Sequence, residues 1–315
     1  MLLRVTHQTR YNYSPPVETA QHMTHLKPRD GTSQRLLEHA LAITPLPDQL
    51  NETRDVYGNA RTFFSLQKSH DELVILARST VQTHEPAPCT NEVGWEQVRE
   101  RYRYRAGGAW DPAAEFVFPS IHVARHDEFA RYARASFKAG APLIVAATDL
   151  MRGIHADMSY DPESTEINTP ALEALRQRKG VCQDFAHIMI ACLRTLGLPA
   201  RYVSGYLLTH PPPGQPRLVG ADASHAWVSV YLPPAGDRDS DDAGAWCDLD
   251  PTNNRHPGED YVTLAIGRDY SDVTPIRGVI HGGAEHTLDV AVTVEPVSAE
   301  PSEPDEITEG RPAAR

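Results

Sequence analysis

Three separated side chains, Cys182, His225 and Asp250, are of the types that carry out acyl transfer through a sulfur nucleophile. A cysteine attacks a carbonyl carbon as its thiolate, and an isolated thiol is mostly protonated at neutral pH. A neighbouring imidazole can take that proton and later protonate the leaving group. A carboxylate on the second ring nitrogen fixes the tautomer of the imidazole. The three residue types therefore predict a thioester-forming site with a nucleophile, a base and an orienting acid.

The segment that begins at Cys182 is predicted to be a helix with the sulfur at its N-terminus. Apolar residues recur there at three- and four-residue spacings: Phe185, Ile188, Met189, Cys192, Leu193 and Leu196. Gly197 and Pro199 predict its end. The free N–H groups and dipole of a helix start favour an anion by about 0.3–1 kcal/mol, or up to about 2 kcal/mol when partly buried. This is too little to ionise a thiol alone, so a base is required.

The base and the acid are expected at the ends of two neighbouring strands. His225 opens the strand-like run HAWVSVYLP, and the run AWCDLD ends at Asp250, before Pro251. Asp248 lies on the same strand face as Asp250 by the period of two, so it is the competing acid. We prefer Asp250 because it lies at a strand end, as His225 does. The backbone N–H of Cys182 is the expected oxyanion donor, and the sequence identifies no second donor.

The runs GVCQDFAHIMIACLRTLGLPARYVSGYL, SHAWVSVYLP and WCDLDPTNN resemble the core of the transglutaminase-like superfamily. The resemblance implies a papain-like α+β fold in which Cys182 is the nucleophile, His225 the base and Asp250 the orienting acid. Animal members crosslink glutamine to lysine, often under calcium control, whereas bacterial members are mostly assigned as cysteine peptidases or amidases. The chain has no D-x-D-x-D-G calcium loop. Water, an amine or another nucleophile therefore all stay open as the acyl acceptor.

Composition shifts along the chain predict four regions. Residues 1–82 alternate strand-like runs with turn signals and are expected to form a β-sandwich domain. They also resemble the β-rich N-terminal domain of bacterial members of the superfamily. A Pro-rich linker is expected at 83–90 and the catalytic core at 91–296, of which 267–294 resembles the C-terminal part of those proteins. The tail, 297–315, is Pro-rich and acidic and is expected to be disordered.

The overall composition argues against several classes of function. The net charge of −12 disfavours binding to nucleic acid or to an anionic membrane. We find neither a signal peptide nor an apolar run of spanning length, and a cytoplasmic setting is the simplest expectation. Four cysteines, at 89, 182, 192 and 247, are too few and too scattered for a disulfide framework. No CxxC or HExxH motif is present, so no metal or cofactor is expected.

For the other polar and aromatic residues near the motifs, we weigh a structural role against a catalytic one. Cys192 lies on the apolar face of the predicted helix and is expected in the core. Asp184, in the first turn, is expected to cap the helix, and His187 points away from Cys182. Trp227 either lines the substrate cleft or packs in the core, and the same two alternatives apply to Tyr160.

The leading hypothesis is a cysteine enzyme that hydrolyses a peptide or isopeptide-like amide. Its partner is a peptide or protein substrate, and the sequence gives no indication of the oligomeric state. Transfer of the acyl group to an amine is one alternative, and a non-catalytic peptide-binding module on the same fold is another. A metal-dependent hydrolase is disfavoured by the absence of ligand spacing. The loop at 209–224, which leads into His225, is positioned to shape specificity.

Overall fold

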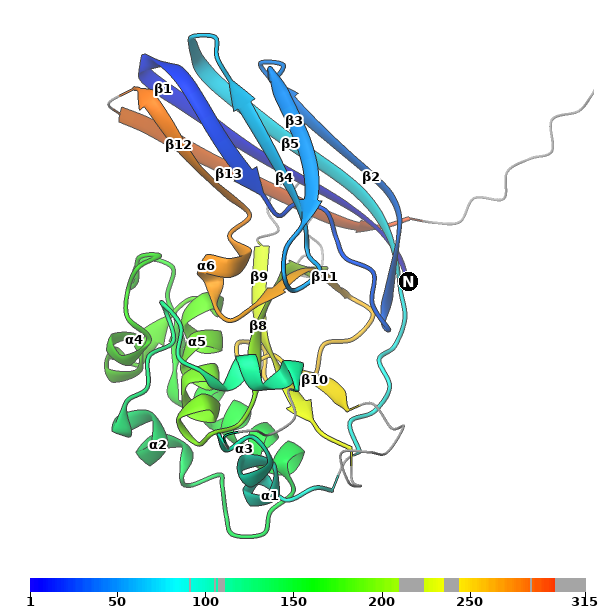
Figure 1. Cartoon of the computed structure of the whole chain (residues 1–315), viewed down its shortest axis with the longest axis vertical. Helices are drawn as coiled ribbons and strands as arrows, with labels where there is room; N and C mark the ends of the chain where they lie inside the picture. The colour runs from blue at the N-terminus through cyan, green and yellow to red at the C-terminus, as the bar shows by residue number, and fades with distance from the viewer. Residues whose placement is uncertain are drawn as a thin grey trace, which may run out of the picture.

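The structure, a computed structural model, describes residues 1–90, 92–104, 106, 111–209, 224–234, 244–283 and 285–297. A curled β-sheet forms one end of the molecule, and a core of helices and strands forms the other (Figure 1). Two segments discussed above, the tail from 298 onward and the loop at 210–223, lie outside the described residues. In the part of the chain that is described, no helix has the length and apolar character needed to cross a membrane.

Seven antiparallel strands form one hydrogen-bonded sheet in the order β2-β5-β1-β4-β3, with β12 and β13 also paired to β1. The length of β1 makes this possible: its residues 2–12 lie between β5 and β13, and its residues 20–24 lie between β4 and β12. The strands are β1 (Leu2–Thr24), β2 (Gln34–Thr44), β3 (Gln49–Arg54), β4 (Ala60–Leu66), β5 (His70–Thr83), β12 (Ile276–Gly282) and β13 (Glu285–Pro296).

The strand pairing in this sheet differs in two respects from the domain organisation that the sequence predicts. The predicted sandwich is one continuous curled sheet, because β1 takes part in both of its halves. Residues 276–296, which the sequence placed in the catalytic core, belong to this sheet through their pairing with β1. Alternating apolar residues predict that a segment is a strand, but they do not specify which strand it pairs with.

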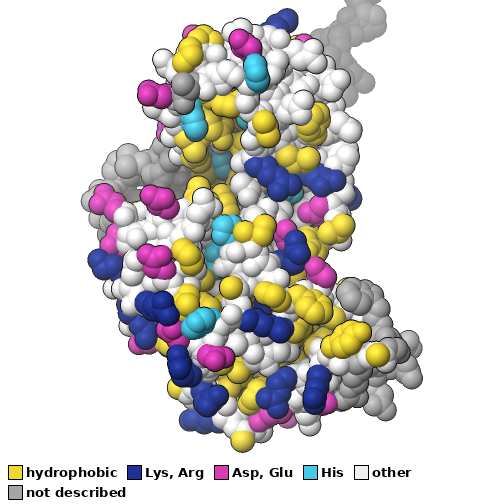
Figure 2. Space-filling view, turned by 60° about the vertical axis from the view of Figure 1, so that its left-hand side comes forward, with side chains coloured by type: hydrophobic (Ala, Val, Ile, Leu, Met, Phe, Trp, Pro, Cys, Tyr) yellow, Lys and Arg dark blue, Asp and Glu magenta, His cyan; other side chains and the backbone are white. Residues whose placement is uncertain are grey.

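The hollow side of the curled sheet is lined by hydrophobic and histidine side chains (Figure 2). Leu288 and Val290, both from β13, are about half exposed, at 53% and 47%. His286, also from β13, lies beside Tyr11 of β1, with 6.1 Å between the ring centroids. This face of the sheet is therefore only partly covered by the rest of the described chain.

The core contains a four-stranded antiparallel sheet in the order β10-β9-β8-β11. Its strands are β8 (Ala200–Leu207), β9 (Ser224–Leu232), β10 (Ala245–Leu249) and β11 (Tyr261–Gly267). The helices are α1 (Trp95–Arg101), α2 (Asp127–Ala133), α3 (Leu143–Asp157), α4 (Ala171–Gln177), α5 (Cys182–Thr195) and α6 (Tyr270–Val273), with a 3₁₀ helix at Pro112–Val117. Two short parallel strands, β6 (Ser159–Tyr160) and β7 (Lys179–Gly180), precede α5. Helices packed against antiparallel strands confirm the predicted α+β class (Figure 1).

Helix α5 confirms the predicted helix, since it begins at Cys182 and is capped at Leu196. Gly197 adopts a φ of +82°, the left-handed conformation that commonly ends helices. Residues 184–194 are all buried, so the helix is enclosed on every side. The buried guanidinium of Arg194 is satisfied by the carbonyl oxygens of Phe118, Ala200 and Arg268.

Two amide side chains from the curled sheet cover the free edge of β11. Gln34 Nε2 donates to the Thr263 carbonyl at 2.8 Å, and Thr263 N donates to Gln34 Oε1 at 2.6 Å. Asn59 makes the same pair of bonds with Ile266, at 2.7 Å and 2.9 Å. An open strand edge exposes unpaired backbone groups, and these two side chains satisfy some of them. The curled sheet is thus joined to the core by specific bonds to β11.

Candidate active site

Cys182 occupies the first turn of α5, where the chain passes from β7 into the helix. Its thiol is free and half-buried. The Asp184 carboxylate accepts a hydrogen bond from the backbone N–H of Val181 at 2.8 Å, which confirms the predicted capping role of Asp184. The sulfur therefore lies at the positive end of a 14-residue helix, where a negative charge is favoured.

His225, at the start of β9, lies between the sulfur and a carboxylate. Its Nε2 is 2.6 Å from Asp250 Oδ2, and the imidazole is also hydrogen-bonded to Cys182. Since Nε2 faces the carboxylate, Nδ1 is the nitrogen left for the sulfur. The structure thus brings together the three residues that the sequence selected, in the order thiol, imidazole, carboxylate.

The neighbours of His225 decide the charge of its ring. Burial by itself lowers the pKa of His225, because a buried imidazolium loses its hydration. The hydrogen bonds to Asp250 and Cys182, with the negative charges of both groups, outweigh burial and raise the pKa to about 10. His225 is therefore an imidazolium at neutral pH, the form that pairs with a thiolate and can donate a proton.

Asp250 is fully buried, yet it is surrounded by donors. The hydroxyl of Tyr261 and the Nδ2 amide of Asn253 each donate to its Oδ2 at 2.7 Å, and Thr252 N donates to its Oδ1 at 2.9 Å. Burial raises the pKa of Asp250, but the bond and charge of His225, together with the bonds from Asn253 and Tyr261, lower it overall. The carboxylate therefore stays ionised next to the imidazolium.

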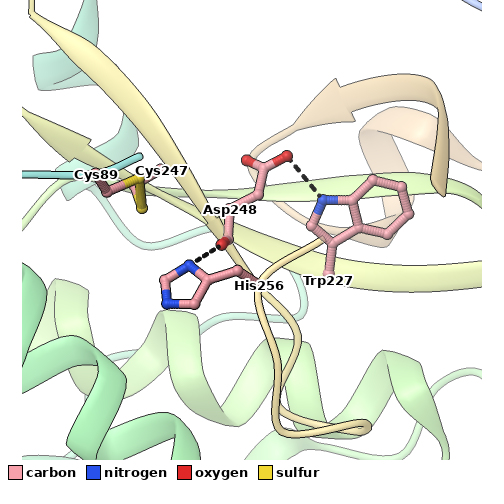
Figure 3. Close-up of a disulfide and its surroundings, with 5 residues drawn as sticks. All are labelled: Cys89, Trp227, Cys247, Asp248 and His256. Carbon is pink, nitrogen blue, oxygen red and sulfur yellow. Dashed lines mark hydrogen bonds between the residues drawn. A yellow bond between two sulfur atoms is a disulfide. The ribbon is translucent and has the colours of Figure 1, made fainter. Parts of the chain in front are cut away.

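Asp248, the competing acid, has a different partner. Its Oδ2 accepts a hydrogen bond from Trp227 Nε1 at 3.1 Å, and its backbone oxygen accepts one from His256 Nδ1 at 3.1 Å (Figure 3). Trp227 is fully buried, so of its two predicted locations the structure shows the core rather than the cleft. The geometry thus favours Asp250 over Asp248 as the partner of His225.

Three tyrosines lie close enough to Cys182 for its charge to affect the pKa of their hydroxyl groups. Tyr202 is buried, Tyr270 is half-buried and Tyr160 is exposed, at 56%. In each case burial is the largest cause of a raised pKa, and the negative charge of Cys182 raises it further. All three phenols therefore keep their protons and are potential hydrogen-bond donors near Cys182. Pairing of β6 with β7 aligns Tyr160 with Gly180, two residues before Cys182.

His187 has the structural role that the sequence predicted. It is buried, and its Nε2 accepts a hydrogen bond from the backbone N–H of Tyr270 at 3.2 Å. Its ring stacks on His122, with 5.3 Å between the centroids. Burial lowers the pKa of His187 to about 3, so the ring is neutral and can accept this bond. His187 therefore helps to place Tyr270 next to the site.

Sequence reasoning missed several residues that support the site. Asn253 lies three residues after Asp250 in the Asp-Pro-Thr-Asn-Asn turn, and amide-bearing turn residues commonly bond to nearby groups, so this contact had a local signal. Tyr261 and Tyr270 come from β11 and α6 and reach the site only through the fold. No spacing rule connects them with Cys182.

The structure contains a disulfide between Cys89 and Cys247, which the sequence analysis did not expect (Figure 3). The linker runs past β10, so Cys89 lies next to a residue 158 positions further along the chain. Such a contact depends on the path of the linker and has no signature in cysteine spacing. Cys247 precedes Asp248 on β10, so the disulfide ties the linker to the strand that leads to Asp250. Of the two remaining cysteines, Cys192 is buried in the core as predicted.

Among the residues that the structure describes, no cluster of three or more His, Cys, Asp or Glu side chains could hold a metal ion.

Two family profiles match the chain. The profile of the bacterial transglutaminase-like N-terminal region matches residues 3–82, and that of the transglutaminase-like superfamily matches residues 127–251. The second match contains Cys182, His225 and Asp250. The first ends within β5 of the curled sheet.

Comparison with individual proteins gives the same assignment. An uncharacterized protein of Mycobacterium tuberculosis is 40% identical over 299 residues, which cover 93% of this chain and 92% of the relative. A protein-glutamine gamma-glutamyltransferase of Pseudomonas aeruginosa is 30% identical over 132 residues, which cover 36% of this chain and 18% of that protein. A crystal structure from Cytophaga hutchinsonii, provisionally assigned as a cysteine protease, has a TM-score of 0.70 at 21% identity and covers 97% of this chain and 94% of its own. By its fold, its profiles and its relatives, the chain belongs to the transglutaminase-like superfamily.

Proposed function

We propose that the protein is a cysteine-dependent acyl-transfer enzyme that hydrolyses a peptide or isopeptide-like amide. One observation carries the proposal: His225 is bonded at once to Cys182 and, at 2.6 Å, to the buried carboxylate of Asp250. This arrangement supplies a nucleophile, a proton carrier and a fixed orientation for that carrier. The superfamily consists largely of cysteine enzymes, which is consistent with the proposal.

In the acylation half of the reaction, the Cys182 thiolate attacks the amide carbon and the carbonyl oxygen becomes an oxyanion. The backbone N–H of Cys182, at the start of α5, is a suitable donor to that oxygen. The C–N bond then breaks as the His225 imidazolium gives its proton to the departing nitrogen. An amine leaves, and the acyl group remains on sulfur as a thioester.

In the deacylation half, water attacks the thioester carbon while neutral His225 takes one of its protons. The carbon–sulfur bond breaks, the carboxylic acid leaves, and the thiolate–imidazolium pair is restored. Asp250 holds the ring throughout and stabilises its charged form, so it does not need to accept a proton. An amine in place of water would give transfer instead of hydrolysis. The similarity of 132 residues to a gamma-glutamyltransferase keeps this second outcome open.

The proposed reaction can be tested by incubating the protein with a peptide library, with and without a labelled alkylamine. The products are then identified by mass spectrometry. Cleavage alone supports hydrolysis, and incorporation of the amine supports transfer. Cys182→Ala should abolish both reactions, whereas Cys192→Ala, which changes a buried thiol, should keep them. Binding without any turnover, unchanged in Cys182→Ala, would instead support a non-catalytic peptide-binding module.

We propose a cytoplasmic location for the enzyme, separately from its activity. The composition suggests the cytoplasm, but disulfides such as Cys89–Cys247 are more common in oxidising compartments. Trapping the thiols in intact cells, followed by mass spectrometry of Cys89, distinguishes the two settings: a persistent disulfide would contradict the cytoplasmic proposal.

A further inference from the structure

A cavity of about 330 Å³ is lined by residues of the β3–β4 hairpin, of α6 and of the start of β12. The hairpin contributes Arg54, Asp55, Val56 and Arg61 to its lining, and His25, Asp272 and Arg277 complete it. None of these residues belongs to the site around Cys182.

The two carboxylates of the cavity are already occupied by other partners. Asp55 holds its own turn together, since it accepts hydrogen bonds from Tyr57 N and Asn59 N, each at 2.9 Å. Asp272 accepts two bonds from the guanidinium of Arg268, at 2.9 Å and 3.1 Å. Asp55 Oδ2 also lies 3.9 Å from His25 Nε2, so this carboxylate faces the cavity, whereas Asp272 is paired with Arg268. The three arginines of the lining therefore outnumber its one carboxylate that has no arginine partner.

The three arginines of the cavity, by contrast, bond only to neutral oxygens in the described structure. Arg54 donates to the Gly58 carbonyl at 3.0 Å, Arg61 to the Thr53 hydroxyl at 3.0 Å, and Arg277 to the Ser271 carbonyl at 3.4 Å. No carboxylate of the described residues is within ion-pair distance of any of the three guanidinium groups. Most of the five N–H donors of each guanidinium remain available.

The pKa of the buried His25 ring at this cavity depends on the charged groups of the lining. Burial is the main cause of its lowered pKa, and the charges of Arg277 and Arg61 lower it further, against the opposing effects of Thr274 and Asp55. Its Nδ1 is bonded to the Thr274 carbonyl oxygen at 3.1 Å, which fixes the ring in place. A local excess of positive charge is unusual in a chain with a net charge of −12.

We propose that this cavity binds a phosphate group. Guanidinium groups match the oxygens of a tetrahedral oxyanion in pairs, and three of them with uncommitted donors line one open cavity. The volume is within the range of small-molecule sites and exceeds what a single inorganic ion needs. The phosphate is carried either by a small free molecule or by a phosphorylated peptide, since both present the same oxygens.

Isothermal titration of the full chain at constant ionic strength tests the site, with pyrophosphate and a phosphoserine peptide as probes and chloride as the reference. Saturable one-to-one binding is expected, with Arg61→Gln and Arg277→Gln each weakening it about tenfold, the loss of one charged pair of bonds. Arg35→Gln removes the same charge from an exposed position on β2 outside the cavity and should leave affinity unchanged.

The two probes identify the source of the phosphate: tighter binding of pyrophosphate indicates a small molecule, and tighter binding of the peptide indicates a protein. Equal weakening by Arg61→Gln and Arg35→Gln would reveal non-specific attraction and overturn the proposal, as would the absence of saturable binding to either probe. Thermal unfolding of each variant in buffer alone, compared with the wild type, shows whether a loss of binding comes from a loss of folding.

Discussion

Replacement of Asp250 by asparagine isolates the electrostatic part of the proposed mechanism, because the side chain keeps its shape and loses only its charge. The pKa of His225 is about 10, compared with an ordinary value of 6.5. This rise corresponds to roughly 5 kcal/mol at ~1.4 kcal/mol per unit, and because burial lowers the pKa, the contributions of Asp250 and Cys182 together exceed it. Asp250→Asn removes both the hydrogen-bond acceptor charge and the Coulombic attraction of Asp250, so it lowers the pKa of the imidazole.

Amide cleavage needs the imidazolium, so its rate should fall as pH rises through the pKa of His225. In the wild type this alkaline decline is expected near pH 10, and in Asp250→Asn it is expected at a lower pH. The variant should also lose about 10²–10⁴-fold in kcat/KM, the usual contribution of general acid–base catalysis. A chromogenic peptide anilide selected from the library provides the assay, with an activated ester as reference, because a phenolate leaves without being protonated.

Asp248→Asn is the matched control, since it changes a carboxylate two residues away whose partner is Trp227. It should leave the alkaline decline where it is and lower kcat/KM less than tenfold. The reasoning is refuted if both variants lose anilide cleavage equally, or if Asp250→Asn leaves the decline near pH 10. An equal loss of ester and anilide cleavage would show that Asp250 acts on the nucleophile instead of on the proton donor.

Four further expectations rest on other contacts. Iodoacetamide should label Cys182 alone in the native protein and should also label Cys192 after unfolding without reductant, because the other two cysteines are joined. Cys89→Ala should lower the free energy of unfolding by about 2–4 kcal/mol, measured in urea, because it opens a loop of 158 residues. Tyr261→Phe removes a 2.7 Å bond to the buried acid and should reduce kcat/KM for the anilide about tenfold at unchanged secondary structure, measured by circular dichroism. The stability that His225 gains from protonation is complete below pH 6.5 and lost as pH rises through about 10, so the unfolding free energies of wild type and His225→Asn should converge over that range.

Local periodicity was sufficient for the parts of the site that depend on one element. The spacing of apolar residues after Cys182 predicted α5 to within a residue, and with it the position of the sulfur at a helix start. The ends of two strand-like runs predicted that His225 and Asp250 could meet, and they pair at 2.6 Å. The choice between Asp250 and Asp248 rested on the same argument, since a side chain within a strand is surrounded by neighbouring strands.

Contacts between distant segments were not predictable in this way. The pairing of β13 with β1 is between strands more than 270 residues apart, and a strand pattern specifies a face but no partner. The disulfide likewise depends on where the linker crosses β10. Buried aromatic residues such as Tyr202 look like ordinary core residues until the fold places them beside the sulfur.

In the proposed mechanism the curled sheet supports the site indirectly, since Cys182, His225 and Asp250 all lie outside it. Gln34 and Asn59 hold β11 by its exposed edge, through four bonds of 2.6–2.9 Å. Tyr261, the first residue of β11, donates to Asp250, and Asp250 in turn sets the charge of His225. The sheet therefore supports Asp250 and His225 through β11, because it fixes the strand from which Asp250 receives one of its donors.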